Sequence, residues 1–138
     1  MYIFMFLLLI SNTINAANPL PIPDKLKTNI QNAMKEYISE QTFDEKLYVF
    51  DAVQNKLLKL KFKKLHPGVV KDGDFYLSCA DFVDQNGQKI DLDFMVKSTG
   101  DAHITTQSIV HAVEGKYRPY HVGDRNEWLT NTISTNKK

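Results

Sequence analysis

Asp81 is the side chain whose surroundings most strongly indicate chemistry. It lies in the segment 75–83, where the alternating residues Phe75, Leu77 and Cys79 are not charged. A carboxylate among such neighbours needs hydrogen bonds or a cation, because its desolvation otherwise costs several kcal/mol. Two interpretations stay open: Asp81 is either the polar anchor of a ligand pocket or a strand-end carboxylate that reaches water.

The turn that follows this segment decides which residues face Asp81. Asn86-Gly87 is the strongest short signal for a two-residue hairpin turn. Such a turn pairs Asp81 with Leu92 and Cys79 with Phe94, so that Asp81 points toward the core beneath a helix. The pocket hypothesis therefore takes Asp81 as the anchor and the following residues as walls: Tyr37, Phe75, Leu92 and Phe94.

Other reactive side chains in the same hairpin have simpler interpretations. A nucleophilic role for Cys79 requires a cationic neighbour or a helix N-terminus, and its predicted neighbour Phe94 is neither. We therefore interpret Cys79 as an inert core thiol. Asp91 and Asp93 share the opposite face of their strand and are expected to diverge toward solvent. No residue is assigned a catalytic role.

The histidines do not have the spacing of a zinc site on a helix or a short loop, and a single cysteine adds little. We therefore predict no metal and no cofactor. His111 and Arg118 form a separate candidate site, because a two-residue turn at Glu114-Gly115 makes them cross-strand neighbours. Such a pair can receive a carboxylate or a phosphate. An ordinary exposed edge hairpin is the simpler interpretation.

The elements that position these residues follow from the hydrophobic period. Residues 25–40 carry apolar side chains at helical spacing. A period of two then predicts strands at 46–52, 58–63, 75–83, 89–97, 103–113 and 116–122. His66-Pro67-Gly68 is expected to end the second strand. The sequence therefore predicts an α+β fold, in which one N-terminal amphipathic helix packs on a curved antiparallel meander of five or six strands. Cystatin-like and NTF2-like folds share this general plan, which carries no function.

The start of the chain predicts export. An apolar run at residues 2–10 precedes a polar stretch and Ala16-Ala17, a pattern typical of a cleavable signal peptide. We expect a signal peptide at 1–16, a single domain at 17–122 and a loosely ordered polar tail at 123–138. The product is expected to be soluble, periplasmic or secreted, without membrane insertion after cleavage. A buried N-terminal strand or helix is the alternative.

Charge and cysteine content narrow the classes of partner. The sequence has 17 basic and 16 acidic residues, so its net charge of +1 gives no reason to expect nucleic acid or anionic lipid as a partner. Its one cysteine excludes an internal disulfide, so stability must come from the core.

The segment HPGVVKDGDFYLSCADF at residues 66–82, followed by Asn86-Gly87, DLDF at 91–94 and IVHAVEGKYR at 109–118, resembles a group of small exported bacterial proteins of unassigned function. The resemblance covers about residues 50–120 and implies a shared fold and export, with no catalytic residues. We predict a non-enzymatic exported binding or interaction module whose partner is an unknown protein or small ligand. The alternatives are the Asp81 pocket or an enzyme that uses Asp81 with His111 or His66.

Overall fold

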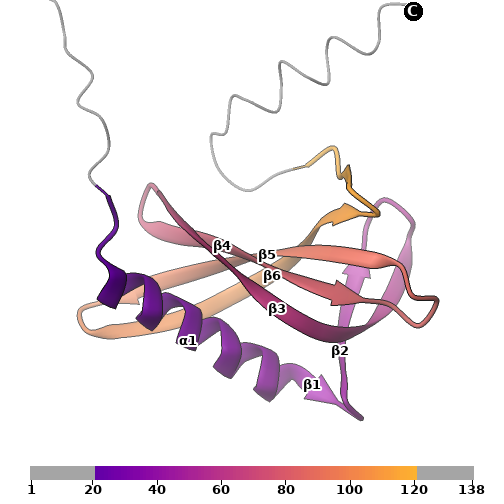
Figure 1. Cartoon of the computed structure of the whole chain (residues 1–138), viewed down its shortest axis with the longest axis horizontal. Helices are drawn as coiled ribbons and strands as arrows, with labels where there is room; N and C mark the ends of the chain where they lie inside the picture. Colours follow the sequence, from indigo (N-terminus) through magenta and orange to yellow (C-terminus); the bar gives the residue numbers. More distant parts are fainter. Residues whose placement is uncertain (1–20, 121–138) are drawn as a thin grey trace, which may run out of the picture.

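The fold is one antiparallel sheet with one helix, seen in a computed structural model that describes residues 21–120 (Figure 1). The elements are α1 (Asp24–Gln41), β1 (Thr42–Phe43), β2 (Lys46–Asp51), β3 (Lys56–Asp72), β4 (Phe75–Val83), β5 (Lys89–Thr99), β6 (Ala102–Val113) and β7 (Lys116–Tyr117). Each strand pairs with the next, so the sheet is a meander. The predicted signal peptide and the predicted polar tail lie outside the described residues. Within 21–120, no helix has the length and apolar character needed to cross a membrane.

The predicted α+β class is wrong, because strands dominate the fold. Strands take 59% of the described residues and the helix only 18%, and the sheet has seven strands instead of five or six. The largest difference is in β3, which was predicted to end at His66-Pro67-Gly68 but continues through that segment to Asp72. The ladder absorbs these three residues as an irregularity, since the pairing passes from Leu65↔Ala80 directly to Val69↔Ser78.

The core lies between α1 and one face of the sheet. The buried helix residues recur at helical spacing: Ile30, Ala33, Met34 and Ile38. The strands contribute Leu47, Val49, Leu58, Leu60, Phe82, Ile90, Leu92, Phe94, Val96 and Val110, among others. The ring of Phe94 lies 6.1 Å from that of Tyr37 and 6.3 Å from that of Phe82, measured between centroids. These contacts fix the helix across the sheet (Figure 1).

The predicted register of the central hairpin is wrong by one residue. Val83 pairs with Lys89, so five residues rather than two connect β4 to β5. The carboxylate of Asp84 accounts for the longer loop, because its Oδ1 accepts the backbone N–H groups of Asn86 at 2.8 Å and Gln88 at 2.9 Å. Since side chains alternate between faces, the shift of one residue exchanges the two faces of β4 relative to β5.

The sheet curls until its two ends approach each other (Figure 1). Asp51, at the end of β2, forms an ion pair with Arg118, which directly follows β7, and both side chains are buried. Tyr37 lines an open cleft of about 480 Å³ beside this closure, together with residues of β2 and β6. The ion pair therefore ties the first strands of the meander to its last.

Candidate functional site

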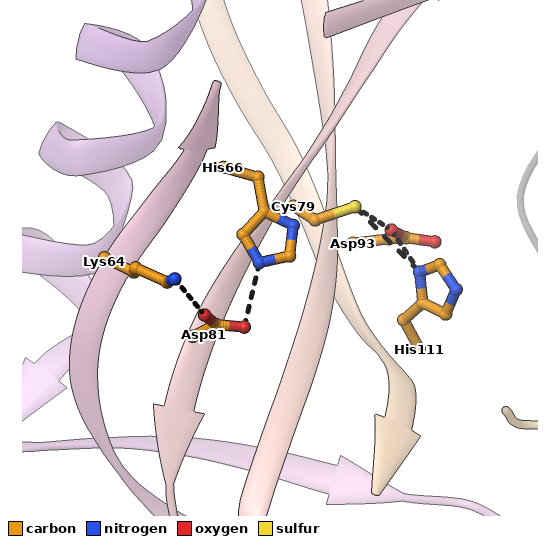
Figure 2. Close-up of polar contacts among 6 residues, drawn as sticks. All are labelled: Lys64, His66, Cys79, Asp81, Asp93 and His111. Atoms are coloured by element: carbon orange, nitrogen blue, oxygen red, sulfur yellow. Dashed lines mark hydrogen bonds and ion pairs between the residues drawn. The ribbon is translucent and has the colours of Figure 1, made fainter. Parts of the chain in front are cut away.

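Six polar side chains form a row across four adjacent strands, on the face of the sheet that α1 does not cover. Because Ala80 and Phe82 belong to the core, their neighbours in β4 point to the opposite face. We call this set the donor row: His66 of β3, Cys79 and Asp81 of β4, Asp91 and Asp93 of β5, and His111 of β6. Five of the six appear in Figure 2 as two groups, His66 with Asp81 and Cys79 with Asp93 and His111.

Irregular pairing positions both histidines of the row. Three residues of β3, His66 to Gly68, lie opposite the single residue Cys79. On the other side, the pairing passes from Asp91↔Ala112 to Leu92↔Val110, so His111 is an extra residue in β6. Bulges of this kind re-aim side chains. Here they bring one histidine from each flanking strand to the central pair of strands.

The first group of the row is formed by Cys79, Asp93 and His111. Asp93 Oδ1 lies 2.8 Å from Cys79 Sγ and 2.7 Å from His111 Nδ1, and the last two atoms are 4.0 Å apart. The side chains of Asp93 and His111 are only 4% and 10% exposed, and Cys79 is half-buried beside them. Sulfur, nitrogen and oxygen donors therefore converge on one shielded point (Figure 2).

The second group is formed by Lys64, His66 and Asp81. Asp81 Oδ1 lies 2.8 Å from His66 Nε2, and Asp81 Oδ2 lies 3.4 Å from Lys64 Nζ. Desolvation raises the pKa of Asp81, but the hydrogen bonds and charges of His66 and Lys64 outweigh it and hold that pKa below its ordinary value. Asp81 is thus a charged, partly exposed group that orients an imidazole.

Asp91 lies between these groups and lacks a matching partner. Its Oδ1 is buried and has no hydrogen bond to any residue within 21–120. The pKa of Asp91 is raised to about 6, chiefly by burial, with the nearby carboxylates of Asp93 and Asp81 acting in the same direction and His111 and His66 in the opposite one. A buried carboxylate oxygen without a donor is costly unless a proton or a cation reaches it.

The donor row contains two sets of atoms that fit a metal ion. In each set the donor atoms lie within 4.8 Å of one another: His66, Cys79 and Asp91 form one, and Cys79, Asp93 and His111 form the other. Imidazole nitrogen, thiolate sulfur and carboxylate oxygen are the ligands that Zn²⁺ takes in proteins. No metal site was predicted from the sequence, because the ligands do not have helical or short-loop spacing. These two sets are instead assembled by the sheet from four strands.

The residues predicted as the walls of a pocket do not enclose Asp81. Leu92 and Phe94 are fully buried core residues, Phe75 begins β4 opposite Lys97, and Tyr37 is partly buried against Phe94. Asp81 faces Asp91 on the other side of the sheet, so it does not anchor a pocket beneath the helix. The corrected register is the physical reason.

The predicted pair of His111 and Arg118 has the expected register but separate side-chain partners. Arg118 donates its backbone N–H to the carbonyl of His111 at 2.8 Å, and β6 and β7 pair as the two-residue turn requires. The imidazole, however, contacts Asp93, and the guanidinium contacts Asp51. The two side chains therefore already have carboxylate partners within the protein.

Two earlier interpretations change with the register. Cys79 pairs with Asp93 instead of Phe94, so it is not an inert thiol of the core. Asp93 is 3% exposed, so it does not diverge toward solvent. The alternation of Cys79 with Asp81 and of Asp91 with Asp93 was the available signal, since each pair shares a strand face in any register.

Comparison of the chain with protein-family models, with curated proteins and with solved structures found no match. The resemblance to small exported bacterial proteins stays a prediction, and the functional argument rests on the donor row.

Proposed function

We propose that this chain is a non-enzymatic exported protein that binds a divalent transition metal ion, of the zinc class, through Cys79, Asp93 and His111. The observation that supports it is the convergence of three donor atoms of different kinds on one shielded point, with separations of 2.7, 2.8 and 4.0 Å. Protons occupy such points in a metal-free protein, and a metal ion displaces them when it binds.

The ligand types favour a particular class of ion. Ca²⁺ and Mg²⁺ prefer oxygen ligands only, whereas thiolate and imidazole favour Zn²⁺ and neighbouring transition metals. Three protein ligands also leave at least one coordination position of a tetrahedral ion for water or another ligand. The site therefore fits the capture or delivery of an ion better than a structural role, in which the protein would supply all four ligands.

The same residue types occur in cysteine-dependent enzymes, but the geometry differs. In a catalytic triad the histidine meets the nucleophile with one ring nitrogen and the acid with the other. Here Cys79 and Asp93 both lie on the Nδ1 side of His111, at 4.0 and 2.7 Å. Cys79 Sγ also lies 2.8 Å from a carboxylate oxygen, so a free thiolate there would face another negative charge. This arrangement supports binding over nucleophilic catalysis.

Isothermal titration of the full-length, metal-free chain with Zn²⁺ tests the proposal. We expect saturable binding, and we expect C79S, D93N and H111Q each to weaken it by about 100-fold or more, because each removes a direct ligand. H103Q is the matched control: His103 lies on the same strand as His111, but it contacts Ser98 Oγ at 2.7 Å, outside the donor row. Absence of saturable binding, or equal affinity in all four variants, would overturn the proposal.

Substitution of Co²⁺ for Zn²⁺ gives a second measurement that does not depend on affinity. A thiolate ligand produces a sulfur-to-cobalt charge-transfer band in the near ultraviolet. We expect this band in the wild type and in H103Q, and its loss in C79S. A cobalt complex without the band would exclude Cys79 as a ligand.

A further inference from the structure

The second set of donors in the row lies on the other side of Cys79 from His111. It consists of His66, Cys79 and Asp91, and its donor atoms lie within 4.8 Å of one another. Cys79 is common to both sets, and it lies between the two histidines in Figure 2. The row thus has two positions for an ion with one thiol between them.

His66 is oriented as a metal ligand before any ion is present. Its Nε2 lies 2.8 Å from Asp81 Oδ1, and Asp81 is further held by Lys64. The other ring nitrogen, Nδ1, lies on the side of the ring that faces Cys79 (Figure 2). Histidines that ligate metals almost always use their second nitrogen in this way, and a carboxylate partner fixes the ring and raises its basicity. Asp81 therefore acts as a positioning residue, because it orients the imidazole of His66.

Asp91 supplies an independent indication that this position suits a cation. Its Oδ1 is buried and has no hydrogen-bond partner among residues 21–120. Asp81 lies directly opposite Asp91 across the β4–β5 ladder, so two carboxylates oppose each other. Like charges in that position repel each other. A positive ion beside Asp91 removes both costs at once.

We propose that the donor row holds two divalent transition metal ions, one at Cys79, Asp93 and His111 and one at His66, Cys79 and Asp91, with the thiolate of Cys79 as their shared ligand. This inference rests on the proposed function, to which it adds a second ion and a bridge. Binding removes the thiol proton of Cys79, so the thiolate and two carboxylates supply three negative charges against four positive ones. The two imidazoles ligate as neutral groups.

Counting ions per chain tests the inference. The full-length protein is loaded with Zn²⁺, separated from free metal by gel filtration and assayed by elemental analysis. We expect two ions in the wild type and in the control H103Q, and one ion in H66Q and in D91N, since these keep the Cys79–Asp93–His111 set. One ion in the wild type would overturn the second site and leave the proposed function standing, whereas no ion would overturn both.

X-ray absorption of the wild type loaded with two equivalents of Co²⁺ tests the bridge without any variant. Two metal–sulfur bonds of about 2.3 Å limit the distance between bridged ions to less than about 4.6 Å. We expect a cobalt–cobalt vector below that limit and a thiolate charge-transfer band that grows through the second equivalent. Two bound ions without that vector, or a band complete at one equivalent, would exclude the shared thiolate.

Discussion

The two faces of the central strands are built from alternate residues of the same segments, yet one face is apolar and packed and the other is polar and charged. On one face, Phe82, Leu92 and Phe94 pack beneath α1 and are at most 1% exposed. On the other, Asp81 opposes Asp91 and Cys79 opposes Asp93. Burial stabilises the first face, whereas the second holds like charges and a buried oxygen of Asp91 that has no hydrogen-bond partner within residues 21–120.

This contrast separates residues that stabilise the fold from residues that have a function. An apolar face needs no ligand to be stable, because its contacts are complete within the chain. The donor row is incomplete by itself, since Asp91 Oδ1 lacks a partner within 21–120. Sites that conflict with stability in this way are typical of functional positions.

The largest effect is expected from the apolar face. Phe94→Ala should destabilise the protein by about 3–5 kcal/mol, because it removes a fully buried ring and leaves a cavity. Urea unfolding followed by circular dichroism measures the change. Leu57→Ala is the control, since Leu57 is 57% exposed and its truncation should cost far less. Similar losses in both variants would contradict the assigned core.

The buried ion pair between Asp51 and Arg118 is expected to come next. Arg118→Met leaves the fully buried carboxylate of Asp51 without its partner, which should cost about 3 kcal/mol. The double variant D51N/R118M should recover part of that loss, because it no longer buries a charge. Equal stability of the single and double variants in urea would show that the pairing does not close the sheet.

On the donor row, removal of a charge should stabilise the metal-free protein. The pKa of Asp91 is raised to about 6, so the folded state holds this proton more tightly than the unfolded state. Stability should therefore fall as the pH rises from about 4 to about 6. Allowing for partial exposure, Asp91→Asn should stabilise the protein by about 1–3 kcal/mol at pH 7.5 and change little at pH 4.

Urea unfolding in the presence of a chelator measures this effect at both pH values. Asp74→Asn is the control, because Asp74 is an exposed partner of Lys97 far along the sheet. Destabilisation by Asp91→Asn at pH 7.5 would show that the carboxylate has a donor after all.

The sequence predicted the elements better than their pairing. The helix, β2 and β4–β6 follow from hydrophobic period alone, and β4 was predicted at its observed bounds. The end of β3 was predicted wrongly, because Pro67 and Gly68 usually end a strand, whereas this ladder accommodates them as a bulge. The fold class was missed partly for the same reason, since β3 has 17 residues and β1 was not predicted, although β7 is shorter than the predicted strand 116–122.

The candidate site was missed because it depends on register. Asn86-Gly87 favours a two-residue turn, but Asp84 caps a five-residue loop and moves every partner of β4 by one position. That single shift takes Cys79 and Asp81 from the core to the donor row. Asp84 precedes the turn in the sequence, so the capacity of its side chain to accept two backbone N–H groups is the local signal for the longer loop.

The smallest effect distinguishes Asp81 from the carboxylate opposite it. The pKa of Asp81 is lowered, so its charged form contributes stability above the unfolded pKa of 3.8, and this contribution is lost as the pH falls through the folded value. Asp81→Asn should therefore cost about 0.5 kcal/mol at pH 6, a small value because the side chain is 37% exposed. Asp91→Asn has the opposite sign under the same chelated conditions. If both substitutions change stability in the same direction, Asp81 and Asp91 do not differ in their electrostatic surroundings, and the proposed cation site at Asp91 loses its electrostatic support.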